Sequence, residues 1–332
     1  MVLLLIFGIL FLFVLIYKWY KERLESESVI NNVLKIRNIM PIFDDFSKYD
    51  DVTLKVGDKG MNIEKINISD MTKEDFEKRY IRLGKPCIIL DAAKNWKCMN
   101  KWSNKYFMKK YGDTYFELTE TYGSPDSDEW SAIALKFKDY NYYMKTRKND
   151  NIPLYIFDEN FATRSDTSHL AKDYEVPEWF KEDIFDLCDK SKKPPFRWII
   201  IGPKRSGADM HHDELHTVAW NTLVYGKKRW LIFPPESFRK DRYEEMETGI
   251  NWYINCYDKY KHLDHYDIIQ NPGETVVIPP NWWHCVINLE ESVAISQNYL
   301  PPSEYEKAKN LIQKDRPDIY DEIETAYKEK YL

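Results

Sequence analysis

The sequence predicts a mainly β fold with helical flanks, preceded by a transmembrane helix at the N terminus. The second half of the chain supplies the main observation, because short runs of alternating apolar and polar residues are separated there by Gly, Pro and Asn. Such spacing is typical of an antiparallel barrel or jelly roll. The other observation is an uninterrupted apolar segment at residues 2–17. The predicted barrel strands lie in RWIIIG (197–202), HTVAWNTLVYG (216–226), KRWLIFPP (228–235), ETVVIPP (274–280), WWHCVINL (282–289) and VAISQNYL (293–300).

The composition narrows the class of protein. The chain has 332 residues, of which 43% are apolar, and this is enough for a substantial core. Its formal net charge of -6 argues against a general nucleic-acid binder, because such proteins rely on dense positive charge. The five cysteines are odd in number and form no CxxC pair, which indicates a reducing compartment rather than a disulfide framework.

The apolar segment at residues 2–17 predicts a short membrane anchor. It is followed by Lys18, Trp19, Tyr20, Lys21 and Arg23, the aromatic and basic flank expected at a bilayer interface. A cleaved signal peptide is the alternative, but no small-residue cleavage site follows. Because the positive charges lie on the C-terminal side, we expect a single-pass membrane protein whose catalytic domain faces the cytosol.

The rest of the chain divides into four predicted parts. Residues 24–60 form a linker, residues 61–190 a region of helices and strands, residues 191–300 the barrel core, and residues 301–332 the C-terminal helices. Thr72 and Asp75 form a capping box before the helix FEKRYIRLG (76–84), CIILD (87–91) is a strand, and a second helix covers residues 137–146.

The C-terminal helices carry an apolar stripe that needs a partner. Ser303 and Glu306 predict a capping box at their start, and Ile319, Ile323 and Tyr327 recur at four-residue spacing. This stripe packs either on the barrel or on a second subunit, and the second case would produce a homodimer.

Three residues of the barrel region form a candidate metal site. His211 and Asp213 make an H-x-D pattern on what we expect to be the first residues of a strand, and His284 follows on a later strand. Period-two alternation points His211 and Asp213 to one face. Two imidazoles and one carboxylate are the facial triad that holds Fe(II) and leaves positions open for a cosubstrate and dioxygen.

His212 and Glu214 form a second possible pair of ligands on the opposite face. Steps of two from His211 lead to the small or polar residues Thr217, Ala219 and Asn221 (TVAWN, 217–221), whereas the other parity leads to residues suited to packing. The parity therefore favours His211 over His212.

At these residues the sequence resembles the JmjC 2-oxoglutarate oxygenases, specifically the phosphatidylserine-receptor-type subgroup of lysyl hydroxylases and arginine demethylases. The segments that carry the likeness are PLYIFD (153–158), GPKRSGADMHHDELHTVAWNTLVYGKKRW (202–230), GETVVIPPNWWH (273–284) and AISQN (294–298). The likeness extends more loosely over residues 63–300.

The resemblance implies a double-stranded β-helix that uses Fe(II), 2-oxoglutarate and dioxygen to hydroxylate a protein side chain. It implies that Lys228 pairs with the distal carboxylate of 2-oxoglutarate, a role that a cation suits. It also implies that Tyr155, Asn221 and Ser296 form hydrogen bonds to the cosubstrate, with Ser296 in place of the usual Thr, and that Trp283 walls the pocket. Lys227 and Arg229 have the opposite parity and are expected to be solvated surface charges.

The resemblance points to lysine as the target, and Asp209, Glu214 and Glu274 are expected near the mouth of the barrel, where they would attract a cation. Demethylation of N-methyl groups on Arg or Lys uses the same oxidant and stays open. Two other classes are an inactive, membrane-tethered binding protein and a metal-dependent cupin isomerase. Neither class needs Lys228.

Overall fold

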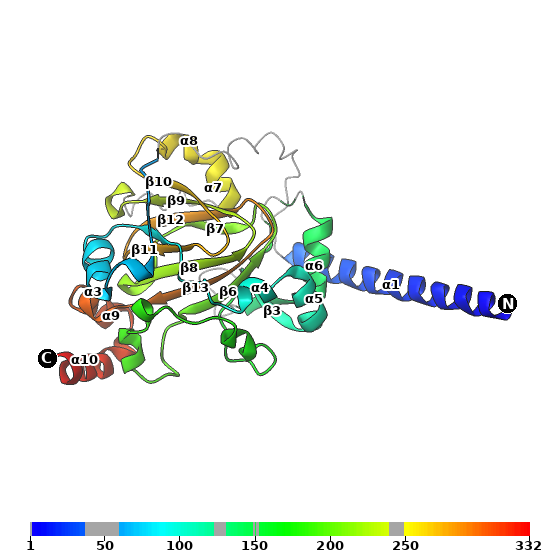
Figure 1. Cartoon of the computed structure of the whole chain (residues 1–332), viewed down its shortest axis with the longest axis horizontal. Coiled ribbons are helices and arrows are strands. Elements are labelled where there is room, and N and C mark those ends of the chain that lie inside the picture. Colours follow the sequence, from blue (N-terminus) through cyan, green and yellow to red (C-terminus); the bar gives the residue numbers. More distant parts are fainter. Residues whose placement is uncertain (1, 37–59, 123–130, 149, 151–152, 239–248) are drawn as a thin grey trace.

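The fold consists of two facing β-sheets with helices around them (Figure 1). The computed structural model describes residues 2–36, 60–122, 131–148, 150, 153–238 and 249–332. Within these residues the larger sheet has the strand order β1-β2-β11-β8-β13-β6-β5-β3-β4, and the smaller has the order β10-β9-β12-β7. The strands are β1 (Glu64–Ile66), β2 (Cys87–Ile89), β3 (Tyr115–Tyr122), β4 (Ser131–Lys136), β5 (Ile156–Asp158), β6 (Arg197–Gly202), β7 (Gly207–His211), β8 (Val218–Tyr225), β9 (Lys228–Phe233), β10 (Tyr266–Gln270), β11 (Thr275–Ile278), β12 (Trp283–Asn288) and β13 (Ser292–Tyr299).

The barrel core is antiparallel throughout, as the alternating pattern predicted. β13 pairs with β6 and β8, and β12 pairs with β7 and β9. All six predicted barrel segments contain a strand, and the predicted strand at residues 87–91 is β2. The prediction of a cupin-type jelly roll is therefore confirmed.

The turn between β8 and β9 depends on a glycine. Gly226 has a φ of +93°, a conformation that side-chain-bearing residues rarely adopt, and a Cβ there would lie 2.3 Å from the Glu291 carbonyl oxygen. The tight turn brings Asn221 of β8 and Lys228 of β9 into the same cavity.

Both faces of the larger sheet are covered. Its outer face packs against helices, including α5 (Asn104–Tyr111) and α6 (Phe137–Thr146), in a core that includes Trp220 and Phe107. The inner face meets the smaller sheet around Ala219 and Trp230. The outer face of the smaller sheet is covered by α7 (Gly249–Asn255) and α8 (Tyr257–Tyr260). The facing sides of the two sheets enclose a cavity.

The first capping box is confirmed and the second is wrong. The Thr72 hydroxyl accepts a hydrogen bond from the Asp75 amide at 3.1 Å, at the start of α3 (Lys73–Phe76), which continues as a π-helical segment, Glu77–Arg82. At the C terminus, a 3₁₀ turn over Pro302–Glu304 encloses Ser303, so α9 (Tyr305–Asp315) begins without a side-chain cap.

The C-terminal apolar stripe packs within the chain. Ile319, Ile323 and Tyr327 of α10 (Pro317–Tyr331) are buried in one cluster with Ile184 and Leu300. The first of the two predicted alternatives, packing on the barrel domain, is the one observed. These helices need no second subunit to cover their apolar face.

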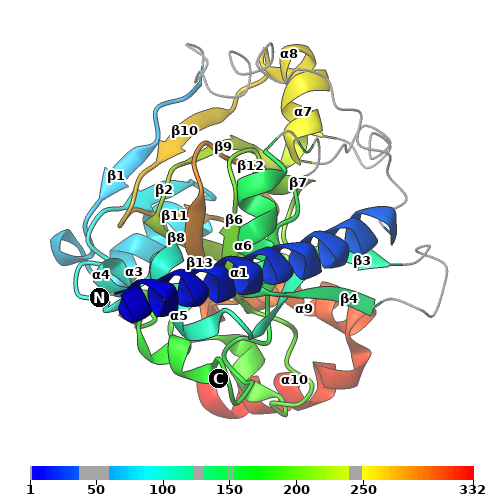
Figure 2. The same ribbon diagram turned by 90° about the vertical axis from the view of Figure 1, so that its right-hand side faces the viewer.

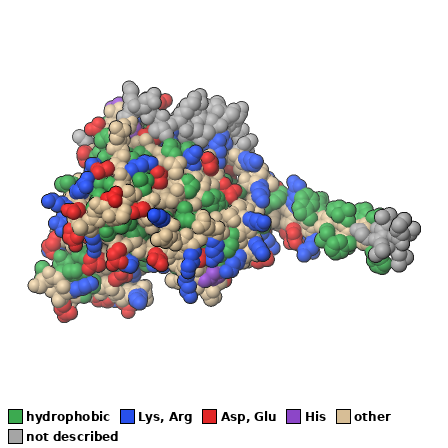
Figure 3. All heavy atoms as spheres, in the orientation of Figure 1, with side chains coloured by type: hydrophobic (Ala, Val, Ile, Leu, Met, Phe, Trp, Pro, Cys, Tyr) green, Lys and Arg blue, Asp and Glu red, His purple; other side chains and the backbone are tan. Residues whose placement is uncertain are grey.

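The predicted transmembrane helix is wrong. Among the residues that the structure describes, no helix is long and apolar enough to cross a membrane. The apolar residues instead form the start of a longer helix, α1 (Val2–Ile36), which continues through residues 18–27, a segment rich in charged side chains. This helix projects from the rest of the chain (Figures 1 and 3). The prediction of a single-pass membrane protein with a cytosolic catalytic domain is therefore also wrong, whereas a membrane contact through residues 2–17 stays a prediction.

The second half of α1 is part of the folded domain, contrary to its expected role in a linker. Ile30 and Val33 are buried in the main core, and the Ser26 hydroxyl donates to Asp139 of α6 at 2.5 Å. Glu27 pairs with Arg147 beyond the end of α6. Figure 2 shows α1 lying across this side of the molecule. The rest of the predicted linker, residues 37–59, lies outside the described residues.

Candidate metal centre

The structure brings His211, Asp213 and His284 together. His211 ends β7, His284 is the second residue of β12, and the two are partners in the strand pairing. One ligand atom from each of the three residues lies within 4.8 Å of the others. Their role as ligands is untested and stays a prediction, but the grouping is the one that the facial triad requires.

Each histidine has one ring nitrogen occupied and the other free to bind a metal. His211 Nδ1 donates to the Asp209 carbonyl at 2.8 Å, and His284 Nδ1 donates to the Trp282 carbonyl at 3.0 Å. These bonds occupy Nδ1 and leave Nε2 of both rings available as a metal ligand, as in known metal centres. The Asp213 carboxylate is oriented in turn by Asn298, whose amide donates to it at 2.9 Å.

The electrostatics keep His284 in its ligand form. Burial and the neighbouring His211 lower the pKa of His284 to about 4. At neutral pH the imidazole therefore carries a lone pair rather than a second proton, which is the form that binds a cation.

His212 does not join this group. Its ring packs edge-on against Trp283 at 4.7 Å between centroids, and its Nδ1 contacts the Asp213 carbonyl oxygen at 3.2 Å. The parity argument thus selected the histidine that the structure groups with His284. The expected position of the motif was wrong, however, because H-x-D begins at the last residue of β7 and not at the start of a strand. Leu215 and His216 take left-handed conformations, with φ of 54° and 59°, and turn the chain into β8.

Lys228 is a buried cation with neutral partners. Its side chain is fully buried, and Nζ donates to the Tyr155 hydroxyl and to the Asn288 side-chain oxygen, both at 2.7 Å. Among the described residues it has no carboxylate partner. Burial lowers the pKa of Lys228 to about 7, because desolvation penalises the charged form. The site therefore favours an anionic ligand that would restore the charge.

A cavity of ≈ 190 Å³ joins Lys228 to the triad. All the residues predicted for the cosubstrate face it. The Ser296 hydroxyl contacts the Trp220 carbonyl at 3.3 Å, and burial raises the pKa of Tyr155, so its hydroxyl is protonated. The lining residues are Tyr155, Phe157, Trp198, Ile200, Ala208, His211, Asp213, Ala219, Asn221, Lys228, Trp230, Ile278, His284, Val286, Ser296 and Asn298.

The sequence held a signal for two polar residues of the site that we did not predict. Steps of two from His284 reach Asn288, which holds Lys228, and a step of two from Ser296 reaches Asn298, which holds Asp213. Alternation along each strand marks both residues as facing the interior.

Three predictions near the site are wrong. Trp283 faces away from the cavity, and its indole donates to the Pro235 carbonyl at 3.3 Å. Arg229 is fully buried and pairs with Asp267, because α7 and α8 cover the side of the sheet expected to face solvent. Glu274 pairs with Lys65 at 2.6 Å, next to the end of β11 that lies opposite to the triad.

The donor set fits Fe(II), and the cavity fits a dicarboxylate. Two imidazoles and one carboxylate converge on one point, with their orientation held by second hydrogen bonds. At the far end of the cavity, Lys228 has room for an anion and lacks one among its described partners.

Comparison with known proteins agrees with this geometry. The chain is 36% identical over 251 residues to the "Bifunctional arginine demethylase and lysyl-hydroxylase psr-1" of Caenorhabditis elegans, covering 72% of this chain and 61% of that protein. It is 37% identical to the "Lysine-specific demethylase JMJ21" of Arabidopsis thaliana, over 70% of this chain and 25% of the relative. The mouse "2-oxoglutarate and iron-dependent oxygenase JMJD4" is 24% identical over 75% of this chain and 63% of its own length.

The chain therefore spans less than two thirds of the length of these relatives. A family model described as "Cupin-like domain" matches residues 73–305, which include every residue of the candidate site. The resemblance to the phosphatidylserine-receptor-type subgroup is confirmed, and the chain belongs to the Cupin-like domain family.

Proposed function

We propose that this protein is an Fe(II)- and 2-oxoglutarate-dependent oxygenase that modifies a side chain of another protein. The observation that carries the proposal is a buried Lys228, without a carboxylate partner among the described residues, in the same cavity as the His211, Asp213 and His284 group. A structural metal site or a cupin isomerase would have no use for such a cation. Two relatives are named as bifunctional arginine demethylases and lysyl-hydroxylases, and a third is named as a 2-oxoglutarate and iron-dependent oxygenase, which supports the proposal.

Seven residues of the cavity have a definite task in this scheme. His211, Asp213 and His284 hold Fe(II) on one side and leave its other positions open. Lys228, helped by the Tyr155 hydroxyl, binds the distal carboxylate of 2-oxoglutarate through charge-assisted hydrogen bonds. Asn221 and Ser296 supply further polar contacts to the cosubstrate.

When bound, iron and 2-oxoglutarate supply the oxidising chemistry, in which the 2-oxo acid and dioxygen give succinate, carbon dioxide and one oxygen atom inserted into a substrate C–H bond. The chain positions these groups and excludes water. Apolar side chains such as Ile278 and Val286 line the walls between the triad and Lys228, so the reacting centre is kept largely dry.

Lysine hydroxylation is the reaction that we propose first. Removal of a methyl group from N-methyl arginine or lysine is the alternative, because hydroxylation of that methyl group gives an unstable hemiaminal. The names of the relatives include a lysyl-hydroxylase and demethylases, so both reactions are tested.

Mass spectrometry separates the two reactions. Peptides with unmodified lysine, and matched peptides with methylated arginine or lysine, are incubated with the enzyme, Fe(II), ascorbate and 2-oxoglutarate. We expect a gain of about 16 Da on lysine, the mass of one transferred oxygen atom. Loss of methyl groups without any gain on unmodified lysine would assign the protein as a demethylase instead.

A further inference from the structure

An acidic side chain, Glu159, lies beside an aromatic residue that lines the cavity, Trp198. Glu159 follows directly after β5 and is exposed. It stands two residues after Phe157, which lines the cavity. Its carboxylate forms a hydrogen bond with the side chain of Trp198. Glu159 thus adjoins the aromatic side of the cavity, and among the described residues it forms no ion pair.

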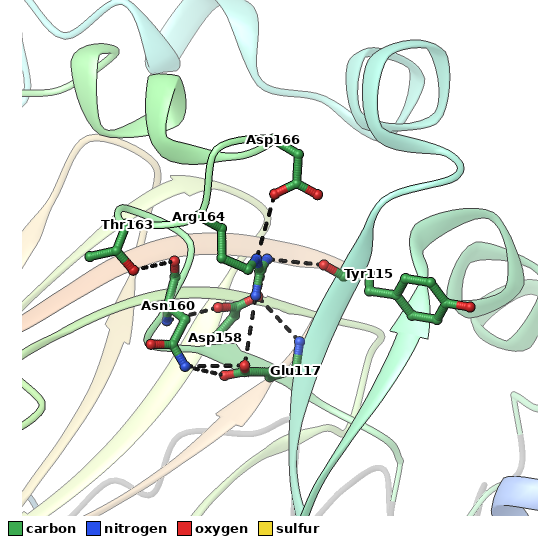
Figure 4. Close-up of polar contacts among 7 residues, drawn as sticks. All are labelled: Tyr115, Glu117, Asp158, Asn160, Thr163, Arg164 and Asp166. Carbon is green, nitrogen blue, oxygen red and sulfur yellow. Dashed lines mark hydrogen bonds and ion pairs between the residues drawn. The ribbon is translucent and has the colours of Figure 1, made fainter.

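The basic residue nearest to Glu159 in the sequence, Arg164, already interacts with other residues. Arg164 donates to the Asp158 carboxylate and to the Tyr115 carbonyl, and it lies 3.7 Å from both Glu117 and Asp166 (Figure 4). Arg164 therefore balances a group of acidic residues next to β5 and leaves Glu159 without compensation. In agreement, burial and the negative charge of Glu117 raise the pKa of Glu159, so a cation placed there would be favourable.

The wall beside Glu159 suits an aliphatic chain. Phe157 and Trp198 pack against each other with ring centroids 5.4 Å apart, and both face the cavity. Aromatic faces cover the methylene stem of a long side chain. A carboxylate at the end of an aromatic wall is an arrangement that recognises lysine or arginine.

We propose that Glu159 binds the cationic end of the substrate side chain, a lysine ammonium or an arginine guanidinium, while Phe157 and Trp198 cover its stem. This inference rests on the proposed function, because it assumes that a protein side chain enters the cavity. The inference adds that the site selects a positive charge on a long, flexible side chain. Glu159 would be a specificity-determining residue and would leave metal and cosubstrate binding unaffected.

The test compares two short peptides that differ only in charge. One has a single lysine among glycine and serine residues, and the other has norleucine in its place, which keeps the stem and lacks the ammonium group. Their dissociation constants are measured by calorimetry, without oxygen, on the full chain loaded with Fe(II) and 2-oxoglutarate. We expect the lysine peptide to bind the unaltered protein about five-fold more tightly, the size of an exposed ion pair.

In Glu159→Gln the two peptides should bind equally, and both should bind as the norleucine peptide binds to the unaltered protein. Glu214→Gln is the matched control, because Glu214 is also an exposed acid but follows Asp213 in the chain and, among the described residues, forms no hydrogen bond with Trp198. That variant should keep the preference for lysine.

The inference is overturned if the unaltered protein shows no preference for lysine, if Glu159→Gln retains the preference, or if Glu214→Gln abolishes it. Succinate formation is measured in parallel without peptide. A protein that prefers lysine but never converts 2-oxoglutarate would refute the proposed function and leave the recognition site standing, so the two failures can be told apart.

Discussion

At the scale of single residues, the metal site depends on which histidine faces the cavity. His211→Ala should abolish Fe(II) binding, because two remaining ligands hold the ion poorly. His212→Ala should retain binding, because this ring packs on Trp283 outside the cavity. Anaerobic titration with Fe(II) measures both. Loss of metal in His212→Ala with retention in His211→Ala would show that the opposite face of the H-x-D segment is used.

The role of Lys228 is tested by removing its charge while keeping its length. Lys228→Met should raise the dissociation constant of 2-oxoglutarate at least about ten-fold, because a hydrogen bond to a charged group contributes about 1.5–3 kcal/mol. Fe(II) affinity should not change. Calorimetric titration of both ligands measures the two effects, and equal 2-oxoglutarate affinity in the variant would remove Lys228 from the site.

The pKa of Lys228 also predicts how cosubstrate binding depends on pH. In the free protein this pKa is lowered to about 7, and a bound carboxylate would raise it again. Above pH 7 the free lysine is largely neutral, so binding of 2-oxoglutarate must take up a proton. The affinity should therefore fall as the pH rises from 7 to 9, by up to about ten-fold per pH unit.

Calorimetry in two buffers of different ionisation enthalpy measures this proton uptake directly. The Lys228→Met protein is the control and should take up no proton at this position. An affinity that is constant between pH 7 and 9, without proton uptake, would show that Lys228 is already charged before the cosubstrate binds.

At the scale of elements, the attachment of α1 depends on a buried polar contact with α6. The Asp139 side chain is buried and accepts a hydrogen bond from Ser26. Ser26→Ala should lower the free energy of unfolding by about 1–3 kcal/mol, the cost of leaving a buried polar group without a partner. Thermal or urea unfolding measures the loss. Ser28→Ala, a change at an exposed position two residues along the same helix, should have little effect; equal losses in the two variants would contradict a specific role for the contact.

The sequence predicts an element well where one local pattern determines it. Alternation located the barrel strands and placed His211 and Asn221 on one face, whereas Lys228 was assigned through the family resemblance; all three line the cavity. The same alternation marks Asn288 and Asn298 as facing the interior. It does not show that they hold Lys228 and Asp213, because those residues lie in other segments of the chain.

Predictions failed where distant segments decide the outcome. Arg229 has a pattern typical of a surface charge, but α7 and α8 cover that side of the sheet and supply aromatic side chains around the Arg229–Asp267 pair. Ser303 has the spacing of a helix cap, but Pro301 and Pro302 direct the chain into a 3₁₀ turn first. The apolar start of α1 has the composition of an anchor, but local composition does not report how the helix continues or what its second half packs against.

At the scale of the whole molecule, the two sheets have different tasks. The larger sheet is buried on both faces and supplies Asn221, Ser296 and Asn298, whereas the smaller sheet supplies His211, Lys228 and His284. The candidate site therefore exists only where the sheets face each other. Its geometry depends on the packing of the entire domain rather than on one motif.

The central claim is that these two sheets together position Fe(II) and 2-oxoglutarate for oxidation. The most direct test measures succinate formed from 2-oxoglutarate by the purified full chain, with and without added Fe(II), next to the Asp213→Ala variant. We predict succinate formation that requires Fe(II), that is stimulated by a lysine-containing peptide, and that is absent in Asp213→Ala. Succinate formation at the same rate in Asp213→Ala, or none in the metal-loaded unaltered protein with 2-oxoglutarate bound, would contradict the claim.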